Sequence, residues 1–139
     1  MKRIQAIVSV IAVLLALLWG CAGQPNQEMN ILGVELNSLT TAAQGYEAYM
    51  HPDPRMGDRE FLENATAGDP SLLAPFEGYV LHVERAGGWV GIIVCTRDGE
   101  GVLQDAGCTP ELDRRLWEDG PISCGRVPSV LSVCGPARE

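Results

Sequence analysis

The 139-residue chain lacks most of the sequence patterns that identify an enzyme. It contains no G-x-S-x-G nucleophile elbow, no H-E-x-x-H zinc motif, no glycine-rich phosphate loop and no C-x-x-C pair. Histidine occurs only twice, as His51 and His82. These absences leave no catalytic constellation, and we expect a non-catalytic protein that requires no cofactor and acts on no small-molecule substrate.

The two histidines are the first candidates for a chemical site. His82 and Glu84 are two residues apart in a predicted strand, so they share a face and could form an acid–base or metal pair. A solvated or cross-strand-paired surface explains them more simply. His51 could join Asp53 and Asp58 as metal ligands, but the neighbouring prolines favour a turn. We therefore predict no metal site.

Basic residues are scarce, and the only lysine is Lys2. From Cys21 to Glu139 the chain keeps all 18 carboxylates and only eight basic residues, all arginine, which gives a formal charge of −10. A surface this acidic repels phosphate backbones and anionic lipid headgroups. Nucleic acid is therefore excluded as an expected partner.

The N-terminus has the three parts of an export signal. Lys2 and Arg3 carry positive charge, an apolar stretch follows as far as Trp19, and Gly20-Cys21 closes the segment. The uninterrupted apolar stretch from residue 6 to residue 19 is 14 residues long. This is shorter than the roughly 20 residues that a membrane-spanning helix needs.

The end of this segment, "LLALLWGC", resembles the lipobox of bacterial lipoproteins at Leu18, Gly20 and Cys21. The resemblance implies that residues 1–20 are a signal peptide, that Cys21 carries a diacylglycerol thioether and acyl chains such as palmitate, and that these attach the protein to the membrane. Ala22 is not the aspartate that commonly retains lipoproteins in the inner membrane, so the outer membrane, facing the periplasm, is favoured. An ordinary secretory signal or an uncleaved anchor, with Cys21 as a bystander, are the alternatives.

Four further cysteines lie in the C-terminal half: Cys95, Cys108, Cys124 and Cys134. Their separations of 13, 16 and 10 residues fit neither a zinc site nor a thioredoxin-like motif. An even count in an exported chain predicts two disulfides, the alternative being free buried thiols.

The N-terminal half is predicted to be helical. Polar residues 22–30 are expected to form a flexible tether, and residues 31–139 a single periplasmic α+β domain. Residues 34–50 place an apolar stripe at three- and four-residue steps, and His51-Pro52 ends that helix. Asp58 is expected to cap a second short helix, through about Ala65. Residues 69–76 are expected to be a loop that can include one helical turn. The stripe consists of Leu36, Leu39, Ala43, Tyr46 and Met50.

The following segment predicts an antiparallel three-stranded meander. Residues 79–84 alternate between apolar and polar side chains, whereas residues 89–95 form a nearly continuous apolar run. Glycine-containing turns separate these strands from each other and from a third strand at residues 101–105. The run at 89–95 is the predicted central strand, and the N-terminal helix is expected to cover one face.

This meander restricts the pairing of the cysteines. Cys95 precedes the turn at Asp98-Gly99, while Cys108 follows the far end of the next strand, about 20 Å away at ~3.4 Å per residue. The Cα atoms of a disulfide must come within about 7 Å. Cys95 should therefore pair with Cys124 or Cys134, and Cys108 with the other.

Between Cys108 and Cys124, the stretch "TPELDRRLWED" predicts a short amphipathic helix, with Thr109 as N-cap and Gly120-Pro121 as the stop. It is expected to pack on the sheet edge. Alternatively, Trp117 with Arg114 and Arg115 could form an exposed contact patch, since Trp and Arg are enriched at interface anchors.

These observations predict a lipid-anchored, non-catalytic interaction or assembly component of an envelope complex of the secretion, conjugation or pilus type. The alternative is an acidic periplasmic binder or inhibitor of a cationic protein such as a cell-wall hydrolase. An enzyme, with a pocket at His82, ranks third.

Overall fold

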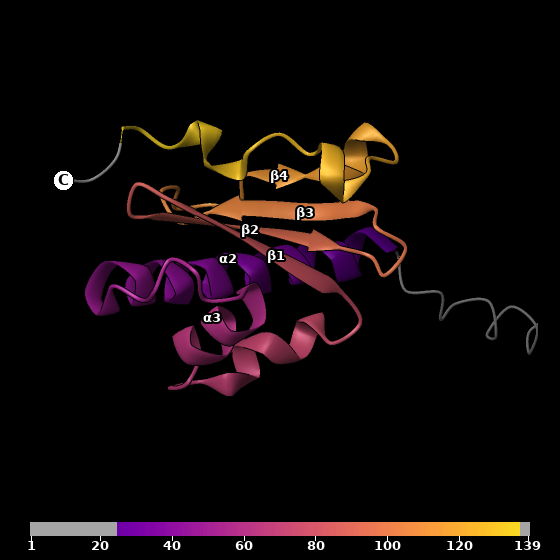
Figure 1. The fold of residues 1–139 in the computed structure, drawn as a ribbon. Coiled ribbons are helices and arrows are strands. Elements are labelled where there is room, and N and C mark those ends of the chain that lie inside the picture. The colour runs from indigo at the N-terminus through magenta and orange to yellow at the C-terminus, as the bar shows by residue number, and fades with distance from the viewer. Residues whose placement is uncertain (1–24, 137–139) are drawn as a thin grey trace, which may run out of the picture.

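A computed structural model describes residues 25–136 and confirms the predicted α+β class. One long helix, a shorter helix and an antiparallel sheet are joined by several 3-10 turns (Figure 1). In chain order, the helices and strands are α2 (Pro25–Met50), α3 (Asp58–Ala65), β1 (Val80–Ala86), β2 (Trp89–Cys95), β3 (Gly101–Ala106) and β4 (Arg114–Arg115). The 3-10 segments are η1 (Pro70–Phe76), η2 (Leu116–Asp119), η3 (Cys124–Arg126) and η4 (Val130–Val133).

The sheet contains the predicted meander and one further strand. Its spatial order is β1-β2-β3-β4, and all neighbouring strands are antiparallel. Gly87 and Gly88 turn β1 into β2 with φ of 59° and 76°, a left-handed conformation that residues with a Cβ rarely adopt. β2 lies between β1 and β3, as predicted.

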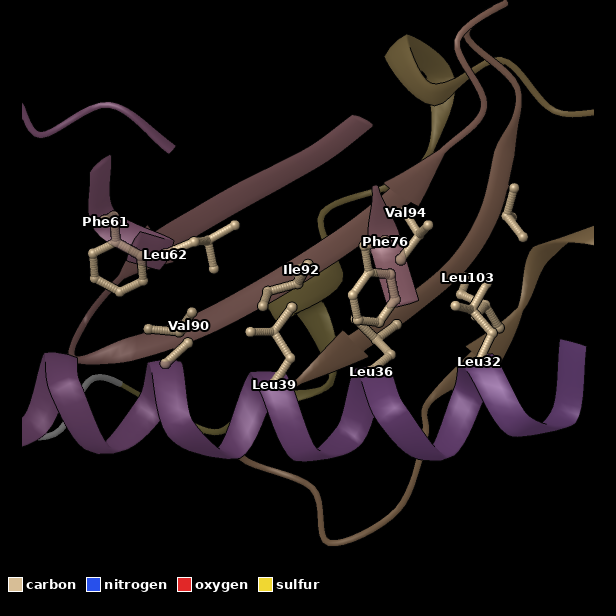
Figure 2. Packing of buried hydrophobic residues seen from close by; sticks show 12 residues of the cluster. Leu32, Leu36, Leu39, Phe61, Leu62, Phe76, Val90, Ile92, Val94 and Leu103 are labelled. Atoms are coloured by element: carbon tan, nitrogen blue, oxygen red, sulfur yellow. The ribbon is translucent and has the colours of Figure 1, made fainter. Parts of the chain in front are cut away.

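Helix α2 covers one face of the sheet. Figure 2 shows Leu36 and Leu39 of α2 pointing toward Val90, Ile92 and Val94 of β2, and all five side chains are fully buried. Burying a leucine or isoleucine side chain stabilises the fold by roughly 1.5–3 kcal/mol. The helix and the central strand thus form the main core, as the apolar stripe predicted. The last residue of that stripe, Met50, is instead exposed at the C-terminal end of the helix.

The predicted tether is shorter than residues 22–30, because α2 begins at Pro25. Proline suits the first turn of a helix, and Glu28 in that turn interacts favourably with the helix dipole. Leu32 is buried and Met29 packs against the core, so tertiary contacts hold this first part of the helix in place. Residues 25–30 therefore belong to the folded domain.

The opposite face of the sheet is covered by the C-terminal segment, residues 114–136. Its η4 turn places Val130 directly over Gly91 in the middle of β2. A Cβ at Gly91 would lie 2.0 Å from Val130 Cγ1, so only glycine permits this approach. Glu84 of β1 accepts hydrogen bonds from Ser129 Oγ and from the N–H of Val130, the latter at 2.9 Å. This carboxylate attaches the segment to the sheet.

Two disulfides hold the same segment, which confirms the predicted participation of all four cysteines. Cys95 pairs with Cys124 and Cys108 pairs with Cys134, with Cα separations of 6.3 and 5.7 Å. The exclusion of a Cys95–Cys108 bond is likewise confirmed. The sequence separations of 29 and 26 residues correspond to about 3.5 kcal/mol each in the chain-entropy model.

The helix predicted between Thr109 and Gly120 is only partly present. Helical structure is confined to the 3-10 segment η2, whereas Arg114 and Arg115 form β4 and pair with β3. The N–H of Asp113 donates to the buried Asp105 carboxylate rather than to a helical carbonyl. This tertiary hydrogen bond and the pairing with β3 take precedence over the local helix signals.

Helix α3 forms where it was predicted, with Phe61 and Leu62 buried. Its N-cap, however, is Gly57, and no side chain caps it. The Asp58 carboxylate instead accepts a hydrogen bond from the N–H of Val83 at 3.1 Å. This bond joins the start of α3 to the outer edge of β1.

Arg85 connects α2, the loop after it, α3 and the sheet. Its Nε donates to Glu47 Oε2 at 2.9 Å, and its two terminal nitrogens donate to the carbonyls of Pro52 and Asp53, each at 3.0 Å. The guanidinium also lies 4.6 Å from the centre of the Phe61 ring. Only 12% of the Arg85 side chain and 17% of the Glu47 side chain are exposed. The ion pair is therefore well shielded from solvent.

We predict that Gly91→Ala destabilises the fold by about 1–3 kcal/mol, because the added methyl group overlaps Val130. Gly45→Ala is the matched control, since a Cβ added at Gly45 of α2 would meet no neighbouring group within 4 Å. It should stabilise by roughly 0.5–1 kcal/mol. Urea unfolding of both variants measures the effects. Equal effects on stability would contradict the described packing.

We predict that Arg85→Ala destabilises the fold by about 3 kcal/mol, because it leaves the shielded Glu47 carboxylate unpaired. Arg59→Ala is the control, because Arg59 forms an exposed pair with Glu63 one helical turn away. Its expected cost is much smaller, because solvent screens an exposed ion pair. A thermal or urea unfolding series in which the two variants lose the same stability would show that Arg85 does not hold these elements together.

Candidate functional site

The three residues predicted to contact a partner do not form one patch. Arg114 and Arg115 are exposed on β4, at one edge of the sheet. Trp117 is half-buried in η2 and packs against the hydrophobic core. Arg115 Nη1 lies 3.7 Å from Glu118 Oε1 in an exposed pair. The two arginines are thus accessible to a partner, whereas Trp117 contributes mainly to packing.

Arg115 lines a groove between α2 and the loop before β4. The groove has a volume of about 360 Å³. Gly33 of α2 and Leu112 are closely packed in the lining of this groove, since a Cβ added at Gly33 would lie 2.9 Å from Leu112 Cδ2. Helix α2 contributes Val34 to this groove, and 68% of Val34 is exposed. The groove therefore combines apolar contact area with one guanidinium and several polar side chains.

Beside this groove lies a buried carboxylate, Asp105 of β3. Its Oδ2 accepts a hydrogen bond from Asn37 Nδ2 of α2 at 3.2 Å, and its Oδ1 accepts one from the N–H of Asp113, also at 3.2 Å. Asp105 is completely buried. It joins α2, β3 and the loop before β4, and no solvent-borne substrate can reach it in this conformation.

Burial raises the pKa of Asp105 to about 6, and the nearby carboxyl of Asp113 acts in the same direction. The hydrogen bond from Asn37 acts against this shift. Burial also raises the pKa of Asp113, which accepts a hydrogen bond from Thr109 Oγ1 at 2.9 Å. The other oxygen of Asp113 is buried without a hydrogen-bond partner. The two carboxyls form a small acidic cluster whose charge depends on pH.

The residues considered for acid–base or metal chemistry have separate contacts. His82 Nδ1 lies 3.9 Å from Asp58 Oδ2, while Glu84 binds Ser129 and Val130 of the C-terminal segment. His51 has a φ of 46° and forms the left-handed stop of α2. Asp53 accepts from the backbone and side chain of Arg55. Within residues 25–136, no three His, Cys, Asp or Glu side chains gather into a possible metal site.

Sequence patterns alone do not single out Asp105, Glu47 or Arg85. Asp105 stands in the apolar strand "GVLQDAG", and an acidic residue at an inward position of such a strand is an available signal of a buried polar contact. Glu47 and Arg85 are 38 positions apart, and nothing local indicates that they pair. Cys21 lies outside the described residues.

Comparisons with protein-family models, with curated proteins and with solved structures found no match to this chain. Among residues 25–136, no helix has the length and apolar character needed to cross a membrane.

We predict that Asp105→Asn removes a component of the pH dependence of stability. The folded pKa lies above the ordinary value of 3.8, so the folded state takes up the proton first. Relative to Asp105→Asn, the wild type should therefore gain about 2 kcal/mol as the pH falls from 7 to 4. Urea unfolding of both proteins at several pH values measures this difference. A constant difference across this range would contradict the assignment.

Proposed function

We propose that the protein is a lipid-anchored, non-catalytic interaction or assembly component of a bacterial envelope complex. It would be attached through Cys21, facing the periplasm, most simply at the outer membrane. The complex would be of the secretion, conjugation or pilus type. The single observation that carries this proposal is the pairing of the cysteines.

The four cysteines of the described domain pair with one another, so none is left to pair with Cys21. Disulfides persist in oxidising compartments such as the periplasm and are rare in the cytosol. Cys21, at the end of the export-type segment, therefore has to be a free thiol, to pair between chains or to be modified. Lipidation at the lipobox-like sequence supplies one.

The short link between Cys21 and the domain also supports this proposal. Only three residues separate Cys21 from Pro25, the first residue of α2. At no more than about 3.6 Å per residue, the start of α2 would lie within roughly 15 Å of the lipidated cysteine. The N-terminal end of α2 and the groove beside Arg115 would then lie close to the membrane surface.

The acidic surface favours attachment by acyl chains rather than by charge. The chain from Cys21 onward carries a formal charge of −10, which repels anionic headgroups. Each buried CH₂ of an acyl chain contributes roughly 0.8 kcal/mol, and two or more chains hold a protein far more firmly than one. The domain itself would remain available to a protein partner.

The same charge supports a second candidate function, an acidic binder or inhibitor of a cationic protein such as a cell-wall hydrolase. Two disulfides would keep its loops rigid, which lowers the entropic cost of binding. Binding of this kind should weaken strongly as salt is added. No binding to basic hydrolases at low ionic strength would remove this candidate.

We predict that Cys21→Ala moves the protein from the membrane fraction to the soluble periplasmic fraction of the expressing bacterium. The reason is that no thioether can form at alanine. Mass spectrometry should show acyl groups on the wild type and none on the variant. The control is Ala22→Ser, which keeps the cysteine and should stay with the membrane. An unmodified wild-type Cys21 would contradict the proposed anchor.

A further inference from the structure

The outer edge of β1 is partly open. β1 is the first strand in the sheet order, so only one of its sides pairs with another strand, β2. Figure 1 shows α3 on the side of the sheet where β1 lies. In the middle of the strand, Asp58 of α3 accepts the outward N–H of Val83. Among the described residues, no side chain forms such a hydrogen bond with the backbone of Val80 or Leu81.

The alternation of an antiparallel pair shows which backbone groups face outward. The N–H of Val83 points away from β2, because it donates to Asp58. Two residues earlier, the N–H and C=O of Leu81 must therefore also point outward, whereas those of His82 point toward β2. Leu81 thus offers a donor and an acceptor to an added strand.

A groove runs beside this open edge. It has a volume of about 480 Å³ and lies between α3, η1 and the first part of β1. Its lining is largely apolar, and 40% of Val80 is exposed. The apolar side chains that line it are Leu62, Leu73, Phe76, Tyr79, Val80 and Leu81. The groove therefore offers apolar contact area next to unpaired backbone groups.

The rim of the groove is acidic. Arg59 and Glu63 neutralise each other in an ion pair of 2.8 Å. Glu77, exposed on the same rim, has no ion-pair partner among residues 25–136. An occupant that carries positive charge would complement Glu77, and the charge of the whole domain acts in the same direction.

From these features we infer that the β1 edge and its groove bind an extended, basic segment of a partner protein by β-strand addition. Backbone hydrogen bonds at Leu81 would give affinity, and alternate apolar side chains would enter the groove. The open part of the edge, residues 80–82, is about three residues long, at ~3.4 Å each, before Asp58 closes the edge at Val83. A basic side chain would face Glu77.

A second copy of the same chain is a poorer occupant. Two mature chains would bring together formal charges of −10 each, and like charges across an interface are unfavourable. A basic segment, by contrast, is attracted by the negative charge of the domain. This inference rests on the proposed function, because it names the surface by which the anchored domain would hold its partner.

The test uses the complete chain in a non-ionic detergent and an acetylated, amidated seven-residue peptide of alternating valine and lysine. Amide hydrogen exchange should show Leu81 protected only when the peptide is bound, and His82 protected in both states. Glu77→Arg should weaken the affinity about fivefold at low ionic strength. The control is Glu111→Arg, an equal charge change at an exposed site that does not line this groove, which should leave the affinity within twofold.

Three outcomes would overturn the inference. They are no peptide binding by the folded chain, equal binding of a valine and glutamate peptide, and Leu81 protection that rises with protein concentration alone, which would indicate a second copy. Peptide binding does not depend on the lipid. If Cys21→Ala leaves the membrane but the wild type does not bind the peptide, only this inference fails. If peptide binding occurs but Cys21 is unmodified, only the proposed anchor fails.

Discussion

Strand β2 is apolar on both faces, and the structure depends on covering both of them. On one face, α2 supplies a regular helix whose leucines meet Val90, Ile92 and Val94. On the other face, the cover is the C-terminal segment, which has only short 3-10 turns and a two-residue strand. Such a segment has little local stability, since isolated turns gain few hydrogen bonds for the entropy they lose. Its position therefore depends on tertiary attachments.

Those attachments come from the sheet itself. The Cys95–Cys124 disulfide holds the segment at the end of β2, and Cys108–Cys134 holds it just after β3. Between them, Glu84 binds Ser129 and Val130, and Gly91 permits Val130 to lie directly on the strand. Two of these attachments are disulfides, which persist in oxidising compartments. The attachment of the C-terminal segment by two disulfides is therefore the feature of the fold on which the proposed periplasmic location depends.

Local signals in the sequence predicted the parts of the fold that local physics determines. Periodicity predicted residues 34–50 of α2, α3 and the central strand, because the burial of one stripe or of a whole strand leaves a repeated pattern. It did not predict the first part of α2, residues 25–33. The excluded Cys95–Cys108 pairing followed from the length of one strand. The helix around Thr109 was wrong over most of its length, because Asp105 binds the N–H of Asp113 from a distant strand. Patterns in the neighbouring sequence cannot predict such a hydrogen bond between separate elements.

The candidate sites were less predictable for the same reason. Tryptophan is a residue type that often anchors an interface, but Trp117 packs against the core and is half-buried. The groove beside β1 gathers side chains from three elements, and the open backbone at Leu81 becomes apparent only from the sheet order and from Asp58. The net charge, by contrast, could be counted from the sequence. It favours a basic partner both for the acidic-binder candidate and for the groove beside β1.

Disulfide mapping of the chain isolated without reduction from bacterial membranes tests the central claim most directly. Peptide mass spectrometry after non-reducing digestion would identify which cysteines are linked. We expect Cys95 to be linked to Cys124 and Cys108 to Cys134, with Cys21 in neither bond. Free thiols at these four positions, or a disulfide that includes Cys21, would contradict the dependence of the fold on its two disulfides.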